Sequence, residues 1–191
     1  MIKCIGILTM LLFSLASPTL AADSAANVIS GLLHPILGFD HLMAMIAVGL
    51  LSVQLKGRHI YRLPATFVGV LFLGALIGIY GWQLPQVEGV ISLSVLILGL
   101  AITFGGRFAF MLAYPIVAVF ALFHGHAHGA EIPQLGRPTG FIAGFMAASA
   151  MLHLFGVLIG SIARSQYKRA ILGAGCAGIG LHMVLLTYGW I

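Results

Sequence analysis

The stretch from residue 34 to residue 41, HPILGFDH, places two histidines and a carboxylate inside otherwise apolar sequence. The chain has only four acidic residues, and one of them, Asp40, lies in the first hydrophobic segment after the N-terminal leader. A carboxylate in such a segment costs about 3 kcal/mol unless it is paired, protonated or bound to a metal. Imidazole and carboxylate groups together suit first-row divalent metals. The stretch therefore predicts a metal-ion site in a membrane protein, formed by His34, Asp40 and His41.

The spacing of these residues limits which of them can bind the same ion. In a regular helix, His34 and His41 lie on one face but about 10.5 Å apart along the axis. They can share an ion only if the helix is interrupted between them. Pro35, which biases His34 away from helical backbone angles, and Gly38 favour such an interruption. Without it, the two histidines mark two successive positions along a path.

A second polar tract, FHGHAHGAE, occupies residues 123–131 and follows the fourth hydrophobic run. His124 and His128 form an i, i+4 pair if the helix continues through Gly125. If the tract is extended, His126 and His128 share a face instead. With Glu131 the tract offers further metal ligands, although an exposed metal-capture tract without transport, and a solvated charge at residue 131, are the simpler alternatives.

The remaining histidines fall in three different places. His153 and His182 lie in the last two hydrophobic segments and are candidate ligands further along a path. Each of them could equally make a hydrogen-bonded contact between helices. His59 lies in a basic loop, where we expect it to be solvated.

The composition is that of an integral membrane protein. Hydrophobic residues make up 61% of the 191 residues and charged residues only 7%, whereas soluble domains carry about 25% charged residues. The net charge is +5, but the basic residues stand in short clusters between apolar runs, which indicates membrane topology and not nucleic-acid binding. No P-loop motif is present, so transport driven by ATP hydrolysis within this chain is excluded.

Six hydrophobic segments follow the leader, each close to the roughly 20 residues that cross a bilayer. The sequence therefore predicts an all-α, polytopic membrane protein with about six transmembrane helices. The expected spans are residues 28–54, 64–82, 87–105, 108–126, 139–163 and 170–190.

The N-terminus has the features of a secretory signal peptide. Lys3 precedes an apolar core, and Thr19 and Ala21 supply the small residues before a cleavage site. We expect residues 1–21 to be cleaved and residues 22–191 to form a single transmembrane domain. Cleavage would leave Cys176 as the remaining cysteine, so no disulfide within the chain is expected.

Basic residues are distributed unequally between the two sets of loops. Only Arg137 falls on one side, whereas seven basic residues follow the first, third and fifth segments: Lys56, Arg58, Arg62, Arg107, Arg164, Lys168 and Arg169. The positive-inside rule makes the second set cytoplasmic. The mature N-terminus and the C-terminus are then expected on the outer side of a bacterial inner membrane.

Small residues recur at helical spacing in three of the segments, which favours close helix packing in lipid. The expected stripes are Gly74 and Gly78 in the second segment, Gly140, Gly144 and Ala148 in the fifth, and Ala170, Ala174 and Gly178 in the sixth.

These residues give the chain a clear resemblance to the HupE/UreJ family of hydrogenase and urease accessory proteins. The family's motif HPxxGxDH is matched by His34, Pro35, Gly38, Asp40 and His41, and its second motif, with His and Glu, is matched by residues 124–131. The resemblance covers essentially the whole chain and implies a nickel or cobalt permease. By resemblance, the first motif's histidines and aspartate are the metal residues.

The sequence thus predicts a permease, not an enzyme, that imports a divalent metal without ATP. Ni²⁺ is the first choice of transported substrate and Co²⁺ the alternative, with no prosthetic group. We expect the ion and the lipid bilayer as partners, with a functional link to hydrogenase or urease maturation. A homo-oligomer remains open. A membrane metallochaperone or sensor without flux, and an intramembrane zinc enzyme with Glu131 as general base, are the other classes.

Overall fold

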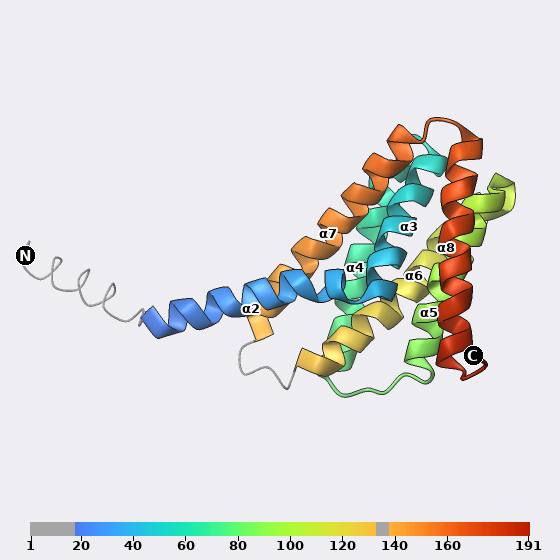
Figure 1. The fold of residues 1–191 in the computed structure, drawn as a ribbon. Coiled ribbons are helices and arrows are strands. Elements are labelled where there is room, and N and C mark those ends of the chain that lie inside the picture. Colours follow the sequence, from blue (N-terminus) through green and yellow to red (C-terminus); the bar gives the residue numbers. More distant parts are fainter. Residues whose placement is uncertain (1–17, 133–137) are drawn as a thin grey trace, which may run out of the picture.

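The computed structural model describes residues 18–132 and 138–191, and these form seven helices (Figure 1). Of residues 18–26, 106–110 and 138 it describes the backbone alone. The helices are α2 (Pro18–Leu37), α3 (Phe39–Leu55), α4 (His59–Ile79), α5 (Val87–Phe104), α6 (Gly106–Glu131), α7 (Pro138–Ile162) and α8 (Gln166–Thr187). No strand occurs in these described ranges, so the predicted all-α class is confirmed. The expected signal peptide lies largely outside the described residues and stays a prediction.

Five of the helices, α4 to α8, are long and apolar enough to cross a membrane. A sixth span is possible if the end of α2, from Asn27, and α3 are counted together, but their axes differ by 78°. The expected first span, residues 28–54, is therefore not one straight helix. In Figure 1, α2 projects sideways from the bundle that the other helices form.

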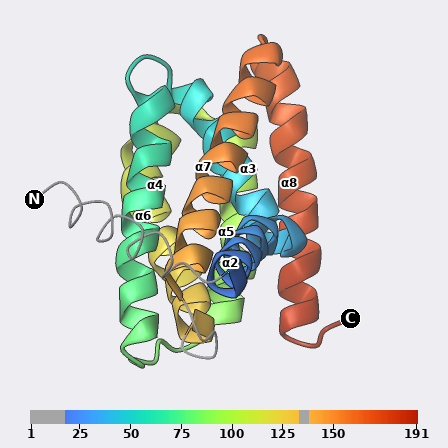
Figure 2. The same cartoon turned by 90° about the vertical axis from the view of Figure 1, so that its left-hand side faces the viewer.

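The bundle is built from helix pairs that approach very closely. α4 packs against α6, α5 against α8, and α7 against both α2 and α3 (Figures 1 and 2). Glycines make these approaches possible: a Cβ atom at Gly74 or Gly78 would overlap the backbone of α6, and one at Gly144 would overlap α2. These predicted small-residue contacts are confirmed. Backbones come this close in lipid only where side chains are minimal.

The stripe predicted on the sixth segment is on the wrong face of the helix. Gly178 of α8 has open space around its Cβ position. The contact with α5 is made by Gly173, Ala177 and Gly180 instead. The sequence offers small residues on two faces of α8, and spacing alone does not say which face meets a protein neighbour.

The two ends of the bundle differ in charge. Lys56, Arg58, Arg164 and Lys168 lie in or beside the loops at one end, which we call the basic end. The loop between α4 and α5, the end of α6 and the C-terminus lie at the other (Figure 1), which we call the histidine end. Exposed aromatic side chains occur at both, as expected of membrane borders: Tyr61 and Tyr167 near the basic end, and Tyr80, Trp82, Tyr188 and Trp190 near the histidine end.

Two helix boundaries differ from the expected spans in ways that matter for the site. α4 begins at His59 and not at Pro64, which lies in the second turn and does not interrupt the helix. α6 continues past residue 126, through Gly125 and as far as Glu131. The histidine tract is therefore helical, and its exposed, extended alternative does not hold.

Candidate metal centre

The break between α2 and α3 occurs at Gly38, whose backbone is extended (φ −78°, ψ 101°). His34 remains in the last turn of α2, with Pro35 inside the helix. The expected interruption between His34 and His41 is thus confirmed, but Pro35 does not push His34 out of the helix. The His34 carbonyl still closes the last turn by accepting a hydrogen bond from the Gly38 N–H at 3.1 Å.

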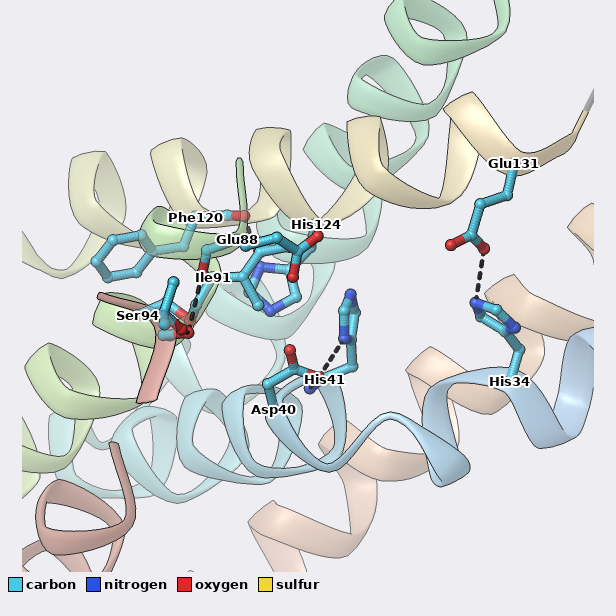
Figure 3. A network of polar contacts seen from close by, with 11 residues as sticks. His34, Asp40, His41, Glu88, Ile91, Ser94, Phe120, His124 and Glu131 are labelled. Atoms are coloured by element: carbon cyan, nitrogen blue, oxygen red, sulfur yellow. Dashed lines mark hydrogen bonds and ion pairs between the residues drawn. The ribbon is translucent and has the colours of Figure 1, made fainter. Parts of the chain in front are cut away.

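Asp40 and His41 form a close pair in the first turn of α3 (Figure 3). The His41 Nδ1 lies 2.6 Å from the Asp40 Oδ1, which also accepts the His41 backbone N–H at 2.8 Å. A carboxylate that accepts from Nδ1 holds the ring orientation and leaves Nε2 as the free lone pair, as in carboxylate–histidine–metal arrangements. Gly38 leaves room for this pair, since a Cβ there would lie 3.2 Å from the His41 Nδ1.

Three buried imidazoles from α3 and α6 meet beside this pair. The ring of His41 lies 4.7 Å from that of His124 and 4.2 Å from that of His128, measured between centroids. His124 and His128 are one turn apart on α6 and are 0% and 3% exposed. Figure 3 shows the His41 ring directed from α3 toward α6. We call these three residues the imidazole trio.

The trio presents ring nitrogens that no group in the described part of the chain satisfies. The His124 Nδ1 donates to the Phe120 carbonyl at 2.8 Å, which fixes Nε2 as its free nitrogen. The Nε2 atoms of His41 and His124 and both nitrogens of His128 are buried without a hydrogen-bond partner among the described residues. Each buried, unsatisfied polar atom costs about 1–3 kcal/mol. Buried imidazole lone pairs on neighbouring rings suit a divalent metal ion, although the ligand atoms of the trio do not all lie within 4.8 Å of one another among the described residues.

A second group of ligand atoms lies next to the trio, toward the histidine end. The His34 Nε2 and the Glu131 Oε2 are 3.0 Å apart. With His128 they form a set in which one ligand atom per residue lies within 4.8 Å of every other. Glu131 is half exposed and His34 is partly exposed, whereas His128 is buried. His128 therefore belongs to both groups and joins the partly exposed set to the buried trio.

His126 faces away from this arrangement, although the sequence groups it with its neighbours. Its Nε2 lies 2.6 Å from the Trp82 carbonyl oxygen, in the loop that follows α4. The helical geometry explains the difference, because residues two apart on a helix point to different sides. His126 thus ties α6 to the α4–α5 loop.

His153 is buried on α7 and shares an aromatic neighbour, Phe67, with the trio. Its Nδ1 donates to the Ser149 carbonyl at 2.6 Å. The ring of Phe67 on α4 lies 4.8 Å from that of His153 and 5.6 Å from that of His124. Phe67 thus contacts both His124 of the trio and His153 of α7.

His182 and His59 are not part of the cluster. His182 is exposed on α8 and lines a hollow with Phe39 and Met183. Neither a hydrogen bond nor a ring contact joins it to the trio in the described part of the chain. The Nδ1 of His59 lies 2.9 Å from the Tyr114 hydroxyl oxygen, so His59 is bonded to α6 and the expectation of a merely solvated side chain is wrong.

Aromatic residues around the site are the feature that the sequence did not reveal. Phe145 packs its ring 4.2 Å from that of His128, and Phe141 lies 5.3 Å from His34. Phe67 contacts both His124 and His153. A chain with 12 phenylalanines gives no signal that distinguishes these from lipid-facing ones, since the distinction depends on which helices meet.

Comparison with known proteins identifies the family. Residues 7–183 match the family described as HupE / UreJ protein. The chain belongs to the HupE/UreJ family. It is 40% identical over 186 residues to Protein HupE of Rhizobium leguminosarum bv. viciae, covering 95% of this chain and 97% of that protein. No solved structure matches. The HupE/UreJ proteins are hydrogenase and urease accessory proteins related to nickel and cobalt transport, and they are not an enzyme family.

Proposed function

We propose that this HupE/UreJ protein is a secondary permease that imports Ni²⁺ through the imidazole trio. The observation that carries the proposal is the set of unsatisfied Nε2 atoms at His41 and His124, beside His128, buried between membrane-crossing helices. Buried polar atoms without partners need an explanation, and ionisable groups within a membrane mark ion paths. A transported cation that binds these nitrogens in passing explains why they have no protein partner and why ionisable groups lie within the membrane.

Import begins at the partly exposed set. Glu131 attracts the hydrated cation, and His34 and His128 replace some of its water. The ion then moves to the trio, where His128 remains a ligand while His41 and His124 replace His34 and Glu131. Because His128 belongs to both sets, the ion need not be fully released between them. Exchange of one or two ligands at a time keeps each step small.

Asp40 acts mainly by orienting His41. Its Oδ1 holds the Nδ1 of that ring at 2.6 Å, so the carboxylate raises the basicity of the nitrogen that faces the ion. Asp40 also brings a negative charge near a site that receives a dication. The sequence alone assigned Asp40 as a ligand, because it does not show how Asp40 and His41 point relative to each other. In the proposed function, that role changes to orienting His41.

The membrane potential is a sufficient source of energy. A doubly charged ion that enters a compartment negative by 100 mV gains about 4.6 kcal/mol, from roughly 2.3 kcal/mol per charge. That corresponds to about three decades of concentration. With the basic end cytoplasmic by the positive-inside rule, the histidine end and both mature termini lie on the outer side of a bacterial inner membrane, and import proceeds in the direction that the field favours.

Nickel is preferred over cobalt because imidazole-rich sites follow the order in which Ni²⁺ binds more tightly than Co²⁺. The product of import would supply hydrogenase or urease maturation. A binding protein without flux is less well supported, since it would need an exposed histidine tract, whereas His124, His126 and His128 are buried. For a zinc hydrolase, the candidate general base Glu131 is already paired with His34.

The test is uptake of radiolabelled Ni²⁺ into cells that lack their own nickel importers. Wild type and His41→Ala are compared at equal membrane expression, with Leu158→Ala, an exposed residue of α7, as the control. We expect wild type and the control to accumulate nickel and His41→Ala to lose uptake, with unlabelled Co²⁺ competing more weakly than Ni²⁺. Normal uptake by His41→Ala, or no uptake by well-expressed wild type, would contradict the proposal.

A further inference from the structure

Phe67 contacts two buried histidines, His124 on α6 and His153 on α7. Its side chain is fully buried on α4. Its ring lies 5.6 Å from that of His124, a member of the trio, and 4.8 Å from that of His153, measured between centroids. A phenyl ring offers no ligand atom to a divalent cation. An ion that leaves the trio toward the basic end therefore meets an apolar side chain first.

His153 has the features of a metal ligand: it is buried, its ring is held in place, and one ring nitrogen is free. The side chain is 1% exposed. Its Nδ1 is held by the Ser149 carbonyl, and its Nε2 is buried without a partner among the described residues. The hydrogen bond fixes the tautomer that leaves Nε2 free to bind a cation.

A hollow that is open to the outside of the bundle extends from His153 toward the basic end, and its lining includes the exposed side chains of Tyr61 and Leu154. Its volume is about 320 Å³, and it lies between α4 and α7. The lining includes Val68 and Ala150 near the level of His153, and Ile60, Tyr61 and Val157 nearer the basic end. His153 and Tyr61 are the only polar side chains among its lining residues. His153 is the one histidine among these lining residues, and its Nε2 is itself buried.

We propose that Phe67 is a movable partition between two chambers, with the imidazole trio on one side and His153 with its cavity on the other. The inference rests on the proposed function, because it assigns the order of events within the same path. Rotation of the Phe67 ring connects the trio to His153. The cavity between α4 and α7 is then the exit toward the basic end.

The division of ligands between the chambers suits transport. Several imidazoles on one side remove water from the ion and retain it. A single imidazole on the other side binds the ion weakly, so that release is fast. Conduction requires sites that bind an ion weakly enough for it to leave. The closed ring also interrupts the row of histidines. Without it, a continuous file of water and imidazole would let protons cross with no metal.

The experiment uses the full chain, purified and reconstituted in lipid vesicles, with radiolabelled Ni²⁺ and an internal pH dye. The variants are Phe67→Trp, Phe67→Leu, Phe67→Ala and His153→Ala. Leu63→Ala is the control, because Leu63 is also fully buried on α4 but does not line the cavity. Equilibrium Ni²⁺ binding to each purified variant is measured alongside, as a report on the trio alone.

A partition predicts that binding and flux separate. Phe67→Trp should lower the initial uptake rate about tenfold while the Kd for Ni²⁺ stays within about twofold of wild type. His153→Ala should do the same. Phe67→Ala should raise the metal-independent proton leak about fivefold, with Phe67→Leu intermediate. Phe67→Leu is conservative enough to report on the partition if the larger changes impair folding.

Two negative results are distinguishable. If wild type imports Ni²⁺ and all Phe67 variants match Leu63→Ala in uptake and proton leak, the partition is overturned and the permease stands. Unchanged uptake by His153→Ala would likewise contradict the role of His153 as a ligand on the path. If reconstituted wild type imports no Ni²⁺ at all, the proposed function fails, and the partition fails with it.

Discussion

The helix pairs α4–α6 and α5–α8 both pack through glycine contacts, but they differ in whether their buried polar atoms have hydrogen-bond partners. In both, glycine lets one backbone touch the other. A Cβ at Gly125 would overlap the Leu71 carbonyl of α4, and a Cβ at Gly99 would overlap the Ala177 backbone of α8. Judged by packing alone, the two pairs are equivalent.

Their polar groups separate them. Between α5 and α8 the Ser92 hydroxyl lies 2.9 Å from both the Glu88 carbonyl oxygen and the Thr187 hydroxyl, and the Ser94 hydroxyl donates to the Ile91 carbonyl at 2.6 Å. On α6, the Nε2 of His124, the Nδ1 of His126 and both nitrogens of His128 are buried without partners among the described residues. The buried hydroxyls of the α5–α8 pair are therefore bonded, although the Nε of Arg169 on α8 is buried without a partner among the described residues, whereas α6 holds several imidazole nitrogens that a bound cation would satisfy.

The largest expected effect comes from His128→Ala, because His128 is the ligand shared by both sets. We expect the Kd for Ni²⁺, measured by equilibrium binding to the purified protein, to rise about 100-fold. His126→Ala is the matched control: the same residue type, buried on the same helix, but bonded to Trp82. Its effect should be a loss of stability of about 1 kcal/mol with little change in Kd. Equal losses of affinity in both variants would remove the distinction between the two faces of α6.

The glycine contacts can be disrupted in each pair separately. Gly125→Ala and Gly99→Ala should each lower the free energy of unfolding by about 2–3 kcal/mol, because the added methyl group overpacks a helix contact. In the folded fraction only Gly125→Ala should weaken Ni²⁺ binding, since it displaces α6. Thermal denaturation in detergent measures the first effect and equilibrium binding the second. Gly175→Ala, with open space around its Cβ position, is the neutral control, and an equal loss in that variant would contradict the packing account.

Asp40→Asn should have a smaller effect on affinity. The amide keeps the size of the carboxylate but accepts more weakly from the His41 Nδ1, so the ring is less firmly oriented and less basic. We expect about a tenfold rise in the Kd for Ni²⁺. An unchanged Kd would show that His41 needs no orienting partner.

His182→Ala should have the smallest effect. The side chain is exposed on α8 and has no contact with the trio, and substitutions of that kind usually change free energies by less than about 0.5 kcal/mol, or about twofold in rate. Uptake of Ni²⁺ by cells measures it. A loss as large as that of His128→Ala would bring α8 into the path, as the sequence alone predicts.

Much of this arrangement follows from the sequence, for identifiable reasons. Hydrophobic length and few charges are enough to predict membrane helices. The i, i+4 spacing of His124 and His128 is enough to pair them once the helix is known to continue through Gly125. The interruption at Gly38 was one of two alternatives that the sequence left open, favoured by Pro35 and Gly38.

What could not be predicted depends on which helix faces which. The spacing of His126 is as suitable as that of its neighbours, yet it turns to the Trp82 carbonyl. Gly178 looks like a packing residue and faces open space. Phe67 gains its position from the approach of α4, α6 and α7. Local pattern sets periodicity, whereas the choice of partner is decided by packing across the whole bundle.

The most direct test of the central claim is X-ray absorption at the nickel edge of the purified, Ni²⁺-loaded protein, for wild type and His41→Ala. The structure predicts that bound nickel in wild type has two to three imidazole ligands, about the number that the trio offers, seen as outer-shell scattering from the rings. His41→Ala should lose one of them and bind more weakly. Nickel coordinated by oxygen alone, or imidazole scattering that is unchanged in His41→Ala, would contradict the assignment of the trio as the site.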